Sequence, residues 1–503
     1  MSDVPLQDEQ PTAASSLLRK VTKTLRGTMD TAHYKSIVLT LLYLRFVSWE
    51  FEQTRRWAEA EGLREEHLLD GVGGQRWIHP LARWDTLIRR VRDPDDDPVT
   101  VLDEALGAMR RSDRDLADLF PPADALIGDM RHSQVTELFT ILEEPLDAAS
   151  YENLLGEFAR FEGKKGGEFH TPRSVARLLV ETLQPERGRV YDPCCGSGGM
   201  LIQAARFVEE QGGDPDADMT YYGQEANIRS WQLARMNLHV NGVQADVRRA
   251  DALERDPVWS PKADWVLANP PFNMRDWARN ESVMHWRHGV PPQTNANFAW
   301  LQHAVDRLSD QGSAGLVLAN GSMSSKQMRE DEIRRAMVEG DLVACVVALP
   351  PQLFSTTPMS ACVWFLTKDK SPQGKAGLTD RRGQTLFIDA RPMGDMVGRA
   401  HRVLTSSQRS EIAGAYHAWR GTGRRGAVYQ DVPGFCRSVG GEEIRRNRHI
   451  LTPGRYVGGA HLEAPALRGG QGAGLIGELE RELLELLERS DQLAGRIRLH
   501  LDT

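Results

Sequence analysis

The sequence predicts an α/β protein with one doubly wound sheet, a helical domain before it and a single helix after it. Strand-like and helix-like segments alternate from about residue 151 to about residue 430, as in a sheet with helices on both faces. Within this region a glycine-rich turn, residues 196–199, joins a strand-like segment to an apolar helix-like run. Helical periodicity before residue 150 and apolar spacings of three and four after residue 475 predict the flanking parts.

The segment before the sheet is expected to contain little besides helix. Residues 1–14 are polar and predicted to be disordered, and residues 15–150 are predicted to form an N-terminal helical domain. Residues 92–98 are rich in aspartate and proline and are expected to form a loop. The helical spacing is seen in the apolar residues Tyr34, Ile37, Val38, Leu41, Leu42 and Phe46.

The sheet region, residues 151–430, is expected to carry its functional site at the carboxyl ends of its strands. Residues 316–319, 343–349 and 361–366 are continuous apolar, β-rich runs, typical of strands buried on both faces. Earlier strand-like segments end near residues 192, 225, 250 and 268. The residues that follow these four ends are therefore the candidates for chemistry.

The first strand end carries the glycine-rich turn. Asp192 and Pro193 lead into Gly196, Gly198 and Gly199, which allow a tight turn and place no Cβ between backbone and ligand. A single Gly-x-Gly is often only a turn. No Gly-Lys-Ser/Thr ending follows, which excludes the phosphate loop of NTPases.

Acidic residues follow three successive strands. Asp192 ends the first, Glu225 ends the second, where a ribose diol is usually held, and Asp251 follows the third, where it is placed to reach an adenine amino group. Each acid alone would be a solvated loop residue. A carboxylate beside the turn would repel a pyrophosphate but suits a cationic amine or sulfonium, which indicates S-adenosylmethionine as the ligand.

The fourth strand end carries the most specific motif, Asn269, Pro270, Pro271 and Phe272, called here the Asn-Pro-Pro-Phe motif. The side-chain carbonyl of Asn269 and the backbone carbonyl of Pro270 can both accept hydrogen bonds from one exocyclic NH2 group. Proline at 271 fixes φ, and Phe272 offers a face on which a flipped-out base can stack. Without the glycine turn and the acids, a proline-rich turn would be the better interpretation.

These motifs resemble the modification (methyltransferase) subunit of type I restriction–modification systems, within the methyltransferases that act on N6 of adenine. The resemblance spans nearly the whole chain. The matching segments are residues 25–30, 167–173, 192–199, 223–225, 269–273, 295–300, 349–354 and 447–457.

The resemblance implies a Rossmann-like, S-adenosylmethionine-dependent domain with an antiparallel last strand, which one of the final β-rich runs can supply. It places Phe169, Thr171, Pro172 and Asn269 in the cofactor site. Thr171 and Pro172 are expected at the methionine end of the cofactor. It also implies that Glu225 holds the ribose and Asp251 the adenine of the cofactor. The implied reaction is methyl transfer to N6 of an adenine flipped out of DNA, catalysed by the Asn-Pro-Pro-Phe motif.

The resemblance also implies partners. These are DNA and a specificity subunit that reads the sequence, with two copies of this chain per specificity subunit. Because the chain has no helicase or nuclease signature, cutting or translocation is expected from a separate restriction subunit. The helical domain is equally consistent with partner docking and DNA clamping and with a packing cap.

The C-terminal part is predicted to contact a partner. Residues 431–474 are expected to form an extension and glycine-rich linker, and residues 475–503 a helix with a coiled-coil seam. Because this helix follows a linker, its apolar face is expected to need a partner, although it could pack on its own domain. The apolar seam consists of Ile476, Leu479, Leu483, Leu486, Leu493 and Ile497.

Composition sets the cellular expectation. The net charge of −8 argues against a protein that coats DNA by itself but leaves a local basic surface possible. Five cysteines without metal-ligand spacing predict a reduced cytoplasm and no metal, and Cys194 and Cys195 are expected to be small packing residues. The longest apolar run, residues 37–44, falls short of the about 20 residues that span a bilayer.

Several alternatives stay open. The same motif suits a methyltransferase of protein glutamine or of ribosomal RNA, and the chain could serve another phage-defence system or act as a solitary methyltransferase. A different class, a non-catalytic DNA-binding scaffold that uses its cofactor as an assembly signal, is weakened because every residue needed for chemistry is present.

Overall fold

The computed structural model describes residues 17, 20, 21, 23, 31–63, 77–112, 119–143, 154, 171–254, 262–277, 286–354, 360–373, 378–397, 401–423 and 428–458. Four predictions lie outside this set: the disordered residues 1–14, the glycine-rich linker that ends at residue 474, the C-terminal helix 475–503 and the role of Phe169.

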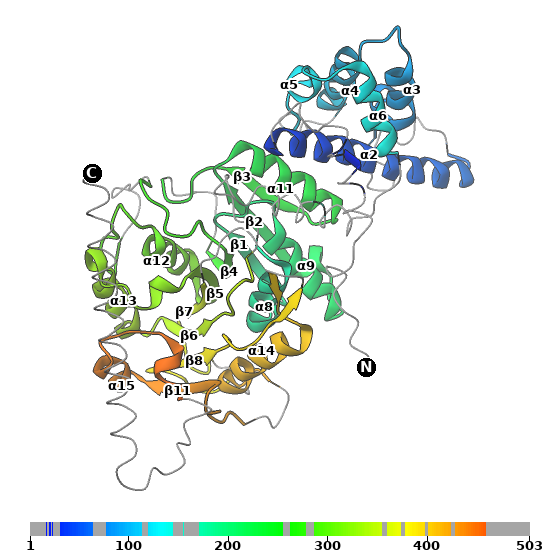
Figure 1. Cartoon of the computed structure of the whole chain (residues 1–503). Helices are drawn as coiled ribbons and strands as arrows, with labels where there is room; N and C mark the ends of the chain where they lie inside the picture. Colours follow the sequence, from blue (N-terminus) through cyan, green and yellow to red (C-terminus); the bar gives the residue numbers. More distant parts are fainter. Residues whose placement is uncertain are drawn as a thin grey trace, which may run out of the picture.

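Among the described residues, nine strands form one sheet in the order β11-β8-β6-β7-β5-β4-β1-β2-β3 (Figure 1). A separate two-stranded sheet contains β9 (Asp395–Val397) and β10 (His401–Val403). The strands of the large sheet are β1 (Gly188–Asp192), β2 (Met219–Glu225), β3 (Ala245–Arg249), β4 (Ala263–Ala268), β5 (Leu308–Ala319), β6 (Val343–Ala348), β7 (Ala361–Thr367), β8 (Gln384–Asp389) and β11 (Cys436–Gly440).

The sheet reverses its winding direction between β1 and β4. From β1 the chain moves outward through β2 to β3 and then returns to β4, which pairs in parallel with the other side of β1. A ligand of an open α/β sheet binds at such a switch point, outside the carboxyl ends of the strands. β7 is antiparallel to both β5 and β6, which confirms the expected antiparallel strand.

Helices cover both faces of the sheet, as the alternation of strands and helices predicts. Buried side chains of neighbouring positions point to opposite faces: Leu267 and Val317 pack with α8, α9 and α14, whereas Val266 and Leu316 pack with α12 and α13. The bounds are α8 (Arg173–Leu183), α9 (Gly199–Glu210), α10 (Pro215–Asp218), α11 (Ile228–Val240), α12 (Asn297–Arg307), α13 (Glu330–Glu339), α14 (Ser406–Arg420) and α15 (Gly441–Arg446), with short 3-10 helices Asn320–Met323, Gln327–Arg329 and Pro453–Arg455.

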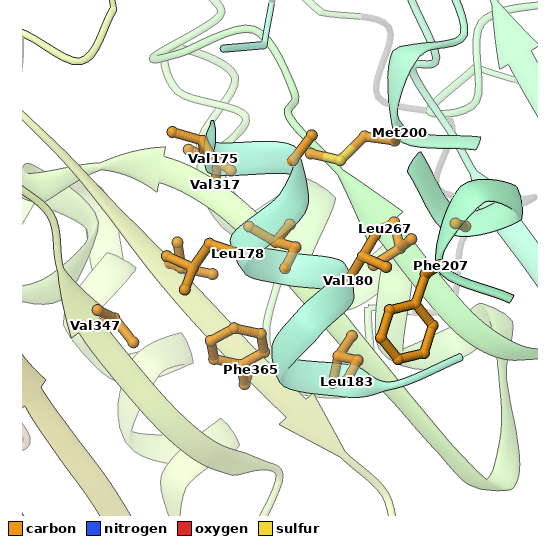
Figure 2. Close-up of a cluster of buried hydrophobic side chains, with 14 of the residues drawn as sticks. Val175, Leu178, Val180, Leu183, Met200, Phe207, Leu267, Val317, Val347 and Phe365 are labelled. Carbon is orange, nitrogen blue, oxygen red and sulfur yellow. The ribbon is translucent and has the colours of Figure 1, made fainter. Parts of the chain in front are cut away.

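Helix α8 leads from the Thr171-Pro172 segment into the core. Its apolar side chains, including Leu178, face the sheet, and Figure 2 shows them beside Leu267, Val317 and Phe365 of three strands. The helix ends where Gln184 adopts φ 53°, a left-handed cap. Packing of α8 therefore fixes the position of the residues at its amino end, next to the switch point.

The segment predicted as a C-terminal extension joins the sheet. β11 pairs antiparallel with β8 at the sheet edge, and α15 follows it directly. The backbone N–H of Leu451 donates to the carbonyl of Met323, which ties residues 447–457 back to the end of β5. The sheet domain thus extends beyond residue 430.

A helical domain forms from the described residues before 144, as predicted. Its helices are α2 (Thr31–Ala60), Pro80–Ala82, α3 (Trp84–Arg92), α4 (Pro98–Ser112), α5 (Ala123–Ile127) and α6 (His132–Ile141). Four residues of the predicted periodic set, Ile37, Val38, Leu41 and Leu42, are buried in its core. The predicted loop separates α3 from α4.

The helical domain docks on the sheet domain through α11. Met236 and Val240 of α11 belong to the core of the helical domain, and Tyr43 of α2 is hydrogen-bonded to His239 Nδ1 at 2.7 Å. Figure 1 shows α2 lying beside α11, on the β3 side of the sheet. No helix in the described part of the chain is long and apolar enough to cross a membrane.

Candidate active site

The structure brings the predicted strand-end residues to one edge of the sheet. β3, β2, β1 and β4 are consecutive parallel neighbours, so their carboxyl ends lie side by side. Asp192 ends β1 and Glu225 ends β2. Asp251 follows β3 after one intervening residue, and Asn269 directly follows β4.

The glycine turn is built by backbone geometry. Gly196 and Gly198 have backbone φ angles of 54° and 82°, values that residues other than glycine, asparagine and aspartate rarely adopt. Gly198 is also the N-cap residue of α9. A Cβ on Gly198 would approach the Leu238 side chain to 3.0 Å. At Gly196 and Gly199 a Cβ would meet nothing within 4 Å, so the backbone there borders open space.

Glu225 is oriented by two backbone groups. Its Oε2 accepts the Gly196 N–H at 3.0 Å and its Oε1 accepts the Asn227 N–H at 2.8 Å. The two bonds fix the direction of the carboxylate at the end of β2. The first bond also couples Glu225 directly to the glycine turn.

Asp251 lies beside Glu225. The Ala250 N–H donates to the Glu225 carbonyl at 3.1 Å, and Asp251 Oδ1 accepts the Leu253 N–H at 2.9 Å. Asp251 is half-buried and thus held next to the ends of β2 and β3.

Asp192 is almost completely buried, with 1% of its surface exposed. Its Oδ1 accepts the Cys194 N–H at 3.0 Å. Burial, and secondarily the negative charge of Glu225, raises the pKa of Asp192 to about 8. A cationic ligand at this place would relieve the repulsion between the two carboxylates.

The side-chain amide of Asn269 is oriented by Thr171. Asn269 Nδ2 donates to Thr171 Oγ1 at 3.0 Å, although the two residues lie 98 positions apart. Thr171 is in turn next to Pro172, which caps α8. The bond directs Asn269 Oδ1 away from Thr171, and that oxygen is buried without a hydrogen-bond partner among the residues that the structure describes. A buried carbonyl without a donor costs about 1–3 kcal/mol, which a ligand N–H would recover.

The ring of Phe272 has a fixed orientation. It packs edge-to-face against Phe354, with ring centroids 5.6 Å apart and an interplanar angle of 69°. Phe354 belongs to the Leu-Pro-Pro-Gln-Leu-Phe segment noted in the sequence, residues 349–354. Because Phe272 is only 7% exposed, a base can stack on its face only after the groups covering it move aside.

Two features of the site were not found from sequence. One is the Thr171–Asn269 bond. The other is a buried network in which Tyr191 Oη donates to Gln224 Oε1 and is hydrogen-bonded to His303 Nε2 at 3.1 Å. Burial lowers the pKa of His303 to about 3, so this ring is neutral. Tyr191 and Gln224 directly precede Asp192 and Glu225, so the network links the strands that carry the two carboxylates.

Cys194 and Cys195 are free thiols beside the turn. Cys195 is buried in the core and its N–H donates to the Gln224 carbonyl at 2.9 Å, whereas Cys194 is half-buried. Burial raises the pKa of both thiols well above its ordinary value. Both therefore behave as small neutral packing groups, as expected.

The site fits S-adenosylmethionine in three respects. Open space borders Gly196 and Gly199, which suits close approach of a ligand to the backbone. Asp192 and Glu225 offer acceptors and negative charge rather than a phosphate-binding set. Within the described part of the chain, Asn269 Oδ1 is an acceptor without a donor at the neighbouring strand end.

A doubly wound sheet with an antiparallel seventh strand, an acidic glycine turn and an Asn-Pro-Pro-Phe motif is the arrangement expected of a methyltransferase that acts on an amino or amide nitrogen. Comparisons agree with this class. Residues 146–464 match the family N-6 DNA Methylase, and residues 15–140 match the HsdM N-terminal domain. The chain belongs to the N-6 DNA methylase family, among the methylase subunits of type I restriction enzymes, which confirms the predicted resemblance.

Individual relatives support this membership. The chain is 44% identical over 318 residues to the type I restriction enzyme HindI methylase subunit of Haemophilus influenzae, covering 62% of this chain and 68% of the relative. It is 30% identical over 530 residues to the MjaIX methylase subunit of Methanocaldococcus jannaschii, covering 96% and 90%. The type I methyltransferase subunit from Streptococcus thermophilus matches with a TM-score of 0.74 at 26% identity, over 89% of this chain and 100% of that structure.

Proposed function

We propose that this chain transfers a methyl group from S-adenosylmethionine to N6 of an adenine flipped out of DNA, as the modification subunit of a type I restriction–modification complex. The observation that carries this proposal is the side-chain amide of Asn269. Its Nδ2 is held by Thr171, and its Oδ1 is a buried acceptor at the switch point of the sheet, to which no described residue donates.

The chain's role toward adenine follows from hydrogen bonding. The N6 lone pair of adenine is delocalised into the ring and is a poor nucleophile. Asn269 Oδ1 and the Pro270 carbonyl accept the two amino hydrogens and so return electron density to nitrogen. Because both acceptors are fixed before the base arrives, most of the rate comes from positioning.

The cofactor is held on the other side of the switch point. Bound S-adenosylmethionine supplies an electrophilic methyl group on a sulfonium. Thr171, Pro172 and Asp192 hold its amino-acid end, Glu225 its ribose and Asp251 its adenine. Gly196, Gly198 and Gly199 leave the backbone open to it, while Pro193 fixes the turn.

Base entry requires rearrangement. Flipping a base costs a few kcal/mol, and the buried ring of Phe272 adds the cost of uncovering it. Stacking on Phe272 then offsets part of that cost, since base–aromatic stacking is worth about 1–3 kcal/mol. We therefore propose that DNA binding and uncovering of Phe272 are coupled.

The proposed assembly follows from the family. A separate specificity subunit reads the DNA, two copies of this chain bind each specificity subunit, and a restriction subunit supplies cleavage. The names of the relatives, each a methylase subunit of a type I restriction enzyme, support the role of this chain as one component.

The test is methyl transfer from S-[methyl-3H]adenosylmethionine to unmethylated DNA by the chain co-purified with the products of its neighbouring genes. Asn269→Ala should lower the rate by about 100-fold or more, the loss typical of removing one preorganised catalytic group, with the cofactor Kd within about twofold of wild type. The matched control is Asn447→Ala, at the C-terminal end of α15 beside the edge strand β11, far from β1 in the strand order.

The labelled product decides the substrate. N6-methyladenine in DNA that depends on Asn269 supports the proposal. Label in ribosomal RNA or in a protein glutamine would favour those alternatives, and cofactor binding without any methyl transfer would favour the scaffold. Retained transfer in Asn269→Ala would overturn the role of this residue.

A further inference from the structure

The backbone that follows the Asn-Pro-Pro-Phe motif takes an unusual path. Asn273 has φ 52°, in the left-handed region, where asparagine is found more often than most residues. Its position at the end of the motif matters because Pro270 and Pro271 have no N–H and cannot anchor the intervening segment with donors of their own. The placement of the Pro270 carbonyl and the Phe272 ring must therefore come from the two ends of the motif.

The first end is the one already described. Asn269 directly follows β4 and its amide is tied to Thr171 at 3.0 Å. This end is anchored in the sheet and at the start of α8.

The second end is held by a pair of asparagines. The Asn273 N–H donates to Asn297 Oδ1 at 3.2 Å, and Asn297 Nδ2 donates to Asn273 Oδ1 at 2.9 Å. Asn295 Nδ2 also reaches Asn273 Oδ1, at 3.5 Å. We call these three residues the asparagine clasp. One amide thus satisfies both a backbone donor and a side-chain acceptor of Asn273.

The clasp is anchored at the amino end of α12, a helix that packs in the core. Asn297 is the first residue of α12, is 1% exposed, and its N–H donates to Asn295 Oδ1 at 3.0 Å. The next residues, Phe298, Ala299 and Trp300, are buried in the core on the α12 face of the sheet. Asn297 therefore cannot shift without moving α12.

Further bonds run alongside the clasp. The Ala296 N–H donates to the Met274 carbonyl at 3.0 Å, and the Asp276 N–H donates to the Gln293 carbonyl at 3.1 Å. Trp277 Nε1 donates to the Pro292 carbonyl at 3.1 Å. These bonds align the two segments, and the clasp acts directly on the residue next to Phe272.

We propose that Asn273, Asn295 and Asn297 are positioning residues that hold the Pro270 carbonyl and the Phe272 ring in place for methyl transfer. This inference rests on the proposed function, because it assigns the clasp to the same base-binding motif. The clasp and the Thr171 bond fix the motif at its two ends, so loosening one end displaces the acceptor and the ring together. None of these clasp bonds involves the glycine turn or Glu225, so we expect cofactor binding to be unchanged when the clasp is loosened.

Two isosteric variants test the clasp. Asn297→Asp keeps the oxygen that accepts from the Asn273 N–H but replaces the donor facing Asn273 Oδ1 by an oxygen. Asn273→Asp keeps the oxygen that accepts from Asn297 and Asn295. Both add one carboxyl group to the same cluster, so the second variant controls for charge and shape.

The measurements are the single-turnover rate of the co-purified complex, its Kd for S-adenosylmethionine and the fluorescence of 2-aminopurine at the target adenine. Asn297→Asp should lower the rate about 10- to 100-fold, because a displacement of about 1 Å can cost 100-fold. The Kd should stay within about twofold of wild type, and the fluorescence of the flipped base should change. Asn273→Asp keeps the acceptor of the clasp and should lose clearly less activity than Asn297→Asp.

A third variant separates the side chain from the backbone angle. Asn273→Gly tolerates positive φ without strain but lacks the carbonyl that receives the clasp. The clasp predicts a loss similar to that in Asn297→Asp, and the same variant serves if Asn297→Asp does not fold.

The outcomes are distinct. A wild-type rate in both Asn297→Asp and Asn273→Gly overturns the clasp, as does an equal loss in Asn297→Asp and Asn273→Asp accompanied by weakened cofactor binding. Absence of adenine methylation by the wild-type complex overturns the proposed function, and the role of the clasp falls with it.

Discussion

At the scale of single residues, Asn269 is an amide with one end satisfied and the other end free for a ligand. Thr171 Oγ1 accepts from its Nδ2, which places the carbonyl oxygen where nothing in the described structure donates to it. An asparagine without this bond could rotate by 180° and present a donor instead. The hydroxyl of Thr171 is therefore expected to matter for catalysis.

Replacing this hydroxyl by a methyl group tests that expectation. Thr171→Val keeps the shape but removes the acceptor, a hydrogen bond worth about 0.5–1.5 kcal/mol, which corresponds to a kcat lower by about 2- to 10-fold. Thr171→Ser keeps the hydroxyl and is the matched control. The measurement is kcat for both variants, and an unchanged kcat in Thr171→Val would show that Asn269 is oriented by other contacts.

The protonation of Asp192 predicts a pH dependence of cofactor binding. Its pKa in the free protein is about 8, raised by burial and then by Glu225, so the carboxyl is largely neutral at pH 6. Binding a cation requires the carboxylate and so releases a proton below pH 8. Affinity for S-adenosylmethionine should therefore rise between pH 6.0 and 7.5, by up to about tenfold per pH unit.

Calorimetric titration over this range measures the effect. Asp192→Asn should bind weakly and with little dependence on pH. The same carboxyl has a folded-state pKa far above its ordinary value of 3.8, so its contribution to stability declines as pH rises from about 4 towards 8. A wild-type Kd that is flat between pH 6.0 and 7.5 would contradict the assignment of Asp192 to the cationic end of the cofactor.

At the scale of elements, α8 connects the core to the site. Leu178 is fully buried among strand residues (Figure 2). Thr171 and Pro172 precede the helix directly. Leu178→Ala should lower the free energy of unfolding by about 2–5 kcal/mol, through lost burial and the cavity left behind. Leu178→Met keeps nearly the same volume and should cost less than about 1.5 kcal/mol.

Chemical denaturation of both variants is the measurement. The loss in the free energy of unfolding should be clearly larger in Leu178→Ala than in Leu178→Met. Equal values would mean that α8 repacks freely and does not set the position of Thr171.

Strand ends could be predicted from sequence because their neighbours in the sheet follow from general topology. Asp192 and Glu225 end their strands and Asn269 directly follows its strand, and parallel strands bring such residues to one edge. The Thr171–Asn269 and Asn273–Asn297 bonds could not be predicted, because their partners are 98 and 24 positions apart and neither pair carries a local signal. The covered face of Phe272 is likewise a product of tertiary packing.

The strand at the edge of the sheet, β11, could also not be predicted from the sequence. β11 has the sequence Cys-Arg-Ser-Val-Gly, too short and too polar to be recognised as a strand, and it joins the sheet only through its antiparallel partner β8. A predicted boundary at residue 430 therefore separated residues that fold together. Through this pairing β11 becomes the edge strand of the described sheet, next to β8.

At the scale of the whole molecule, the helical domain and the sheet domain share a core across α11. Met236 of α11 is 1% exposed and belongs to the core of the helical domain. Met236→Ala should therefore lower the free energy of unfolding by about 2–5 kcal/mol. Met236 itself belongs to the core of the helical domain, whereas Asn237 and Leu238 of the same helix contact the glycine turn, so the cofactor Kd should stay within about twofold of wild type.

Thermal unfolding and cofactor titration of this variant separate the two domains' roles. A loss of stability with unchanged cofactor binding and lower methylation would favour a helical domain that serves DNA or partner binding. Unchanged methylation at a temperature where the variant is folded would favour a packing cap. Loss of cofactor binding would contradict independence of the two sites.

Partner-directed methylation of adenine is the central claim, and a methylome tests it most directly. The chain, with and without the products of its neighbouring genes, would be expressed in a host free of DNA methylation, with Asn269→Ala as control. We predict N6-methyladenine at a two-part sequence only when the neighbours are present and Asn269 is intact. Methylation by the chain alone would contradict its dependence on a specificity subunit, and N6-methyladenine in the Asn269→Ala strain would contradict the mechanism.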